Sequence, residues 1–190
     1  SGHSESILSV AFCGGGQWIV TGSGDQTAKV WEASSGKELL TFKGHSAMIW
    51  SLASSPDGQR IVTGDDDAVA KVWEAASGKE LLSLKGHSAA ITSVAFSPDG
   101  ERIVTGCLHG TAKVWDAAKG DELIVLNVNR PPISSVAFSA NGQWIITGSP
   151  GQATVWAAAS GREVLTLKGH GHPVAFSPDG KTIISGSIDG

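Results

Sequence analysis

The chain has 190 residues, of which 41% are hydrophobic, and a formal net charge of −4 at pH 7. This composition is typical of a globular domain with a substantial core, and no apolar run approaches the roughly 18 residues that a membrane-spanning helix needs. The 14 lysines and arginines are scattered along the chain, whereas nucleic acid requires a basic face. We therefore expect neither a nucleic-acid partner nor a membrane partner.

Two further features bear on the parent protein and its compartment. The sequence begins at Ser1 and its only methionine is Met48, so we expect a trimmed chain or a piece of a longer polypeptide. Cys13 and Cys107 form no C-x-x-C pair. This usage is typical of reduced thiols and favours a cytoplasmic location.

A tryptophan recurs along the chain with an almost constant period. Trp31, Trp73, Trp115 and Trp156 stand 42, 42 and 41 residues apart, and a Gly-His pair recurs in step with three of them. A period of this length is that of the four-stranded blade of a propeller. We therefore treat residues 1–190 as a single propeller domain or part of one. Its repeats cover approximately 2–43, 44–85, 86–127 and 128–168, with an incomplete copy over 169–190.

The third copy shows the expected elements most clearly. Ile91, Val94 and Phe96 mark a first strand. Ser-Pro-Asp-Gly at 97–100 then forms a turn, because Pro presets φ and Gly accepts a positive φ. Four short strands joined by tight turns make an antiparallel meander that cannot bury both of its faces alone, so neighbouring copies must cover them. The remaining strands are predicted at 102–105, 111–115 and 122–126.

The copies resemble the blades of the WD-repeat β-propeller family. The run GHSAAITSVAFSPDGERIVTG followed by TAKVWD is close to the family consensus, and about 26 of 42 residues are identical between the second and third copies. The resemblance implies an all-β fold of four complete blades plus a two-stranded half blade. It also implies a hydrogen-bonded tetrad of His, Ser or Thr, Asp and Trp in each blade. The matching residues are His3, Thr21, Asp25 and Trp31; His45, Thr63, Asp67 and Trp73; and His87, Thr105 and Trp115.

The later copies depart from this tetrad. The third carries His109 where the aspartate would stand, and the fourth has Val128-Asn129 for Gly-His and a one-residue deletion around Pro150. Losing one charge-assisted hydrogen bond costs on the order of 1.5 to 3 kcal/mol. We therefore expect the third and fourth blades to be less rigid than the first two.

Other polar clusters were weighed as metal or catalytic sites. His170-Gly171-His172 is the only His-x-His of the chain, and Asp65-Asp66-Asp67 could bind a hard cation. A tetrad role for the repeated histidines and a solvated acidic turn are the preferred interpretations. Cys13-Gly14-Gly15-Gly16 aligns with Ser97-Pro98-Asp99-Gly100, so we interpret it as a variant turn. Because no nucleophile has an obvious His-Asp partnership, we expect no enzyme activity and no cofactor.

The family resemblance also implies where partners dock. In such propellers the loops that enter the first strand and those before the tetrad aspartate lie on one rim of the ring. Trp50 is a candidate anchor there, although it could instead pack into a neighbouring blade. Trp18 and Trp144, on second strands, are expected to be packing residues. The candidate rim residues are Leu8, Met48, Trp50, Asp66, Thr92 and Leu108.

The half repeat at the C-terminus raises the question of self-assembly. Its second strand, 182–185, would form an open edge that invites pairing with another chain. We expect a second copy to contribute blades to a closed homo-oligomeric ring, most simply a dimer; truncation of a longer propeller is the competing explanation. The leading function is a non-catalytic scaffold that binds proteins or peptides. A purely structural self-assembling repeat protein and a ligand-sensing propeller domain are the alternatives.

Overall fold

The computed structural model describes residues 2–169 and 171–186. Within them, four four-stranded antiparallel sheets follow one another along the chain, and a two-stranded sheet comes last. This confirms the predicted all-β fold of four blades and a half blade. His170 of the His-x-His pattern and the last four residues lie outside the described residues. No helix in the part of the chain that the structure describes is long and apolar enough to cross a membrane.

The strands have similar lengths in every blade. Blade 1 contains β1 (Ile7–Cys13), β2 (Trp18–Ser23), β3 (Thr27–Glu32) and β4 (Glu38–Lys43), with a 3-10 turn, η1 (Gly14–Gly16), after β1. Blade 2 contains β5 (Ile49–Ser54), β6 (Arg60–Asp65), β7 (Val69–Glu74) and β8 (Glu80–Lys85). Blade 3 contains β9 (Ile91–Phe96), β10 (Arg102–Cys107), β11 (Thr111–Asp116) and β12 (Glu122–Asn127). Blade 4 contains β13 (Ser135–Phe138), β14 (Trp144–Ser149), β15 (Gln152–Ala157) and β16 (Glu163–Lys168), and the half blade contains β17 (Val174–Phe176) and β18 (Ile183–Ser185).

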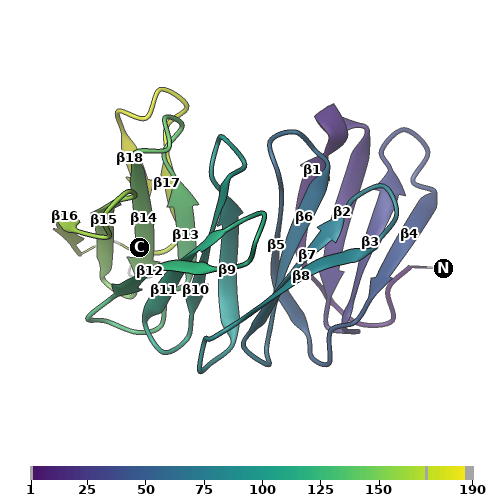
Figure 1. Ribbon diagram of the computed structural model, residues 1–190, viewed down its shortest axis with the longest axis horizontal. Coiled ribbons are helices and arrows are strands. Elements are labelled where there is room, and N and C mark those ends of the chain that lie inside the picture. Colours follow the sequence, from purple (N-terminus) through teal and green to yellow (C-terminus); the bar gives the residue numbers. More distant parts are fainter. Residues whose placement is uncertain (1, 170, 187–190) are drawn as a thin grey trace.

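Each blade is a simple meander in which consecutive strands pair. In blade 1, for example, Thr21 of β2 lies opposite Val10 of β1 and Lys29 of β3. The sheets stand side by side, with β1–β4 at one end of the molecule and β13–β16 together with β17–β18 at the other (Figure 1). The first strands of successive blades contact one another, so β1, β5, β9, β13 and β17 form the innermost row.

A glycine on the second strand of each blade lets the next blade approach closely. A Cβ added to Gly64 would lie 2.5 Å from Cγ2 of Ile91, and one added to Gly106 would lie 2.5 Å from Cγ2 of Ile133. Real Cβ atoms do not come this close to a neighbour, so a larger residue would push the blades apart. The glycine of the repeated Thr-Gly pair is therefore explained by the close packing of neighbouring blades.

The hydrophobic core lies between sheets. Between blades 2 and 3, Val62, Val72 and Leu84 of one sheet pack on Ile91 and Trp115 of the next. Between blades 1 and 2, the rings of Phe42 and Trp73 are stacked with their centroids 5.5 Å apart. This agrees with the expectation that a single blade cannot bury its own faces.

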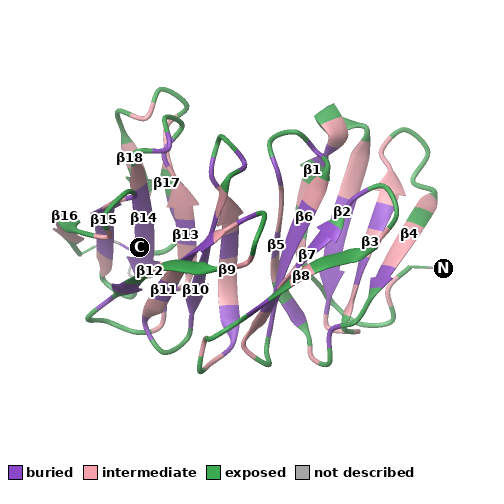
Figure 2. Ribbon diagram, viewed as in Figure 1, coloured by how far each residue is buried: buried purple, intermediate pink, exposed green. Residues whose placement is uncertain are grey.

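One face of blade 1 is an exception, because none of the blades within residues 2–169 and 171–186 covers it. Ile7, Val10 and Phe12 are 54%, 65% and 69% exposed. Ile49 and Ile91, which match Ile7 in the next two blades, are completely buried. Figure 2 shows a buried, purple segment on β9. The exposed face of β1 therefore has the composition of an interface between blades.

Candidate functional site: the loop rim and its hydrogen-bonded supports

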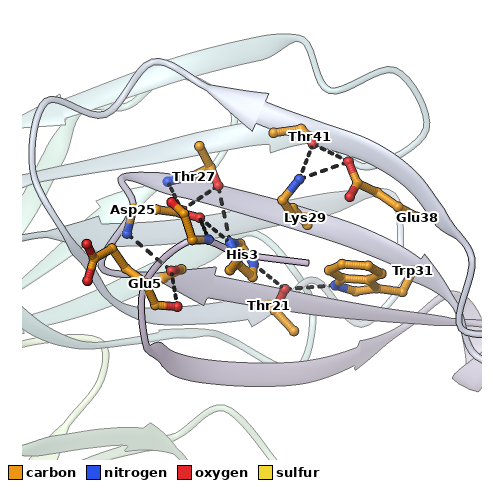
Figure 3. Close-up of polar contacts among 11 residues, drawn as sticks. His3, Glu5, Thr21, Asp25, Thr27, Lys29, Trp31, Glu38 and Thr41 are labelled. Atoms are coloured by element: carbon orange, nitrogen blue, oxygen red, sulfur yellow. Dashed lines mark hydrogen bonds and ion pairs between the residues drawn. The ribbon is translucent and has the colours of Figure 1, made fainter. Parts of the chain in front are cut away.

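In blade 1 the structure brings together all four residues expected for the tetrad (Figure 3). His3 Nδ1 lies 2.8 Å from Asp25 Oδ2, and His3 Nε2 lies 2.7 Å from Thr21 Oγ1. Since a carboxylate only accepts, Nδ1 carries the proton and Nε2 accepts from the threonine hydroxyl. The Thr21 oxygen in turn accepts from Trp31 Nε1 at 2.8 Å. The chain of bonds thus joins the segment before β1 to β2 and β3.

The carboxylate at the end of this chain is strongly held. Thr27 donates through both its hydroxyl and its backbone N–H to Asp25 Oδ1, at 2.6 and 3.0 Å. Burial raises the pKa of Asp25, but the hydrogen bonds from Thr27, His3 and Ser4 outweigh it and hold that pKa well below its usual range. Asp25 is therefore ionised whenever the protein is folded near neutral pH.

Blade 2 has the same chain of bonds but a different carboxylate. His45 Nδ1 lies 2.6 Å from Asp65 Oδ2, whereas the sequence alignment pointed to Asp67. Asp67 instead accepts a hydrogen bond from the Ser46 hydroxyl at 2.7 Å. The assignment of Asp67 to the tetrad is therefore corrected to Asp65. The rest of the expected set is in place: Thr63 Oγ1 lies 2.6 Å from His45 Nε2 and 2.8 Å from Trp73 Nε1.

Strand geometry explains this shift. Thr63 and Asp65 both belong to β6 and are two residues apart, so their side chains lie on the same face of the strand. Asp65 also binds the backbone N–H of Val69 at 2.9 Å and is only 1% exposed. In blade 1 the equivalent strand position is Ser23, and the carboxylate comes from the following turn. The two-residue alternation was a signal in the sequence that could have identified Asp65.

In blade 3 the chain of bonds lacks a carboxylate. His87 Nε2 lies 2.7 Å from Thr105 Oγ1, which accepts from Trp115 Nε1 at 2.8 Å. His109, at the turn position, contacts the Ser88 hydroxyl, and Cys107 stands at the strand position. Burial lowers the pKa of His87 to about 4, and the nearby ammonium of Lys113 adds to the effect. His87 is therefore a neutral, half-buried imidazole at neutral pH.

Blade 4 keeps only the last bond of the chain. Trp156 Nε1 donates to Thr147 Oγ1 at 2.9 Å. Asn129, which stands where the other blades have histidine, is exposed. The hydrogen-bonded support thus weakens from blades 1 and 2 to blade 3 and then to blade 4.

These supports hold two sets of loops together at one end of the strands. The backbone N–H of Gly24 donates to Ser6 O at 3.0 Å, and Asp66 N donates to Met48 O at 3.0 Å. Leu108 N makes the same bond to Ala90 O. The loops before the first strands and the turns after the second strands therefore form one surface. We call this end of the molecule the loop rim; it comprises residues 4–8, 24–26, 46–50, 66–68, 88–92 and 108–110.

Most of the expected partner-binding residues are accessible on the loop rim. Leu8, Met48, Trp50 and Leu108 are 37%, 39%, 39% and 44% exposed. Thr92 is half-buried, and its hydroxyl lies within hydrogen-bond distance of the Gly106 and Ile133 carbonyls. The structure therefore directs Thr92 toward the interior, where it joins blade 3 to blade 4.

Trp50 and Asp66 form a pair on this surface. Trp50 Nε1 donates to Asp66 Oδ1 at 2.8 Å, so its indole is fixed in place while much of its surface stays open to solvent. Trp18 and Trp144, by contrast, are half-buried and pack against the cores between blades. The three consecutive acidic residues at the end of β6 and in the following turn contact different partners: Asp65 contacts His45, Asp66 contacts Trp50 and Asp67 contacts Ser46.

The comparisons with known proteins agree with this geometry. The model of the family described as WD domain, G-beta repeat matches five stretches of the chain, at residues 1–32, 36–74, 78–116, 120–157 and 161–190. The chain belongs to this WD-repeat family. A 35-residue segment is also 51% identical to the vegetative incompatibility protein HET-E-1 of Podospora anserina. That segment covers 18% of this chain and 3% of HET-E-1. WD repeats generally build propeller-type, non-catalytic surfaces for protein interaction.

Proposed function

We propose that this WD-repeat chain is a non-catalytic scaffold that binds a protein or peptide on its loop rim, with Trp50 as the main anchor. The observation that carries the proposal is the fixed, accessible indole of Trp50, held by Asp66 and flanked in sequence by Met48. Tryptophan is enriched among the residues that dominate binding energy at interfaces, and a fixed side chain loses little entropy on binding. The free, buried thiols of Cys13 and Cys107 support a reducing compartment, and a cytoplasmic location is part of the proposal.

A peptide selection followed by a matched pair of variants tests this proposal. Peptides selected from a random display library against the chain should bind Trp50→Ala at least about tenfold more weakly than the parent, as expected for an anchor residue. Leu39→Ala, at a residue of β4 that is 41% exposed, is the control and should bind as the parent does. Thermal unfolding of both variants should match the parent. Equal binding by Trp50→Ala, or a lowered melting temperature with unchanged binding, would contradict the proposal.

A second candidate function is self-assembly, and the uncovered face of blade 1 supports it. Ile7, Val10 and Phe12 present the side chains that elsewhere pack between blades. At the other end of the molecule, Ile184 of β18 is 64% exposed, whereas Ile146, its equivalent in blade 4, is completely buried. We propose that a second copy covers these faces and that the two chains close a homodimeric ring.

The solution mass at several concentrations tests the self-assembly. The parent chain of 19.5 kDa should run as a species of two chains, and Val10→Asp should reduce it to one, because a charge cannot be buried between blades without a partner. Val164→Asp, at a residue of β16 that is 44% exposed, is the control and should stay associated. A mass of one chain for the parent at every concentration would contradict the proposed self-assembly. It would not affect the scaffold proposal.

A further inference from the structure

The loop rim carries acidic side chains but no lysine or arginine. Its acidic residues are Glu5, Asp25, Asp66 and Asp67. With histidine counted as neutral, the formal charge of the loop rim at pH 7 is −4, which equals the net charge of the whole chain. The residues outside the loop rim are therefore neutral when taken together, and the negative charge of the chain is concentrated at this end of the strands.

Two of these carboxylates are exposed and bonded only to neutral donors. Asp66 accepts the indole N–H of Trp50 through Oδ1, and Asp67 accepts the Ser46 hydroxyl through Oδ2. Each bond uses one of the two carboxylate oxygens and leaves the negative charge uncompensated. None of the ion pairs among the described residues includes either aspartate.

The carboxylates on the outer strands differ, because the chain itself supplies their cations. Lys29 Nζ of β3 lies 2.9 Å from Glu38 of β4, and Lys71 Nζ of β7 lies 2.7 Å from Glu80 of β8. Blade 3 repeats the pair between β11 and β12. The two exposed aspartates of the loop rim lack such a lysine, so a cation for them has to come from another molecule.

The exposed apolar side chains of the loop rim lie beside these aspartates. The N–H of Asp66 donates to Met48 O at 3.0 Å, and its carboxylate holds the indole of Trp50. An indole bonded through its N–H keeps its ring faces for other contacts, and tryptophan is the aromatic ring that cations prefer. Glu5 of blade 1 adds a third exposed carboxylate, which points away from His3 (Figure 3). An apolar contact surface and uncompensated negative charge therefore meet at Trp50.

We propose that the partner segment on the loop rim is basic. An apolar residue of the segment packs against Met48 and Trp50, and a lysine or arginine beside it pairs with Asp66 and Asp67. A neutral segment would bury part of these carboxylates without a counter-charge, which costs free energy, and an acidic segment would add repulsion. The acidic rim also attracts a basic segment before contact and so speeds its association. The inference rests on the scaffold proposal and names the chemistry of its partner.

The random peptide library that tests the scaffold proposal also tests the charge of the partner. Peptides selected against the parent chain should contain lysine and arginine at least about twice as often as the unselected library, because complementary charge favours binding. The tightest-binding selected peptide then serves as the probe. A second form of this peptide, with each lysine and arginine replaced by glutamine, should bind the parent at least about tenfold more weakly.

A pair of isosteric substitutions locates the charge on the chain. Asp66→Asn and Asp67→Asn remove the charges but keep an oxygen that accepts from Trp50 and Ser46. Each should weaken binding of the probe about threefold, and the double variant about tenfold. The matched control combines Glu101→Gln with Asp121→Asn, two exposed residues at the opposite end of the strands, and should bind as the parent does.

The salt dependence of association provides a second readout. Between about 0.05 and 0.5 M sodium chloride, the association rate of the probe with the parent should fall at least about fivefold, and with the double asparagine variant less than about twofold. Peptides that require Trp50 but have no excess of basic residues, or equal binding by the double variant, would overturn the inference and leave the scaffold proposal intact. A library that gives no peptide dependent on Trp50 would overturn both.

Discussion

Blades 2 and 3 share about 26 of 42 residues, yet the histidines of their hydrogen-bonded chains, His45 and His87, have different neighbours. His45 of blade 2 lies 2.6 Å from the carboxylate of Asp65, whereas His87 of blade 3 has Cys107 at that strand position and His109 at the turn position. Both histidines still contact a threonine that accepts from the blade's tryptophan. The hydrogen bonds among histidine, threonine and tryptophan therefore form whether or not a carboxylate lies beside the histidine. The carboxylate is the member of the chain of bonds that differs between the two blades.

The comparison with blade 1 shows why the carboxylate can vary. Asp25 reaches His3 from the turn after the second strand, and Asp65 reaches His45 from the strand itself. Two backbone positions, two residues apart, can thus present an oxygen to the same imidazole nitrogen. The following experiments test how much each position contributes.

The largest expected effect comes from removing the carboxylate of blade 2. Asp65→Ala breaks a buried pair with His45 and leaves the Val69 N–H without its acceptor. Breaking such a pair costs about 3 to 5 kcal/mol. Asp67→Ala removes only a contact with Ser46 at the surface and should cost less than about 0.5 kcal/mol. Urea unfolding of the two variants measures both values, and a larger loss for Asp67→Ala would restore the assignment that the sequence suggested.

The next effect is the acid sensitivity of blade 3. The folded-state pKa of His87 is about 4, below the ordinary value of 6.5, so between these pH values the unfolded chain binds a proton that the folded chain does not. The contribution of His87 to the free energy of unfolding is therefore fully present above pH 6.5 and is lost as the pH falls toward 4. The difference of pKa corresponds to about 3 kcal/mol.

A neutral replacement isolates this contribution from those of the other titrating groups. Gln at position 87 can accept from Thr105 but does not titrate, so His87→Gln should lose less stability than the parent between pH 6.5 and 4. Urea unfolding at a series of pH values in this window checks the difference between the two slopes. Parallel curves for parent and variant would show that His87 is not the acid-sensitive group.

Most of the fold was predictable because it is repeated. The tryptophan period and the Ser-Pro-Asp-Gly turn located the four strands of blade 3 to within two residues, since alternation and turn residues act locally. The choice between Asp65 and Asp67 was wrong because an alignment does not say where a strand ends and its turn begins. The accessibility of Trp50 depends on which residues of neighbouring blades meet, and no local pattern carries that information.

The smallest expected effect comes from giving blade 3 the carboxylate that blade 2 has. Cys107 is completely buried at the position that matches Asp65, and its thiol lies 3.1 Å from the Thr111 hydroxyl. Cys107→Asp should therefore place a carboxylate beside His87 Nδ1. The new charge-assisted bond should stabilise the chain by about 1 to 2 kcal/mol at pH 7, net of the cost of burying the charge. A carboxylate neighbour also favours the protonated imidazole, so the loss of stability between pH 6.5 and 4 should become smaller than in the parent.

Cys107→Ser, which keeps the size of the thiol, is the matched control and should leave the pH dependence unchanged. If Cys107→Asp destabilises the chain while Cys107→Ser does not, the interior of blade 3 has adapted to a neutral histidine. Replacing a single residue would then not be enough to exchange the two arrangements.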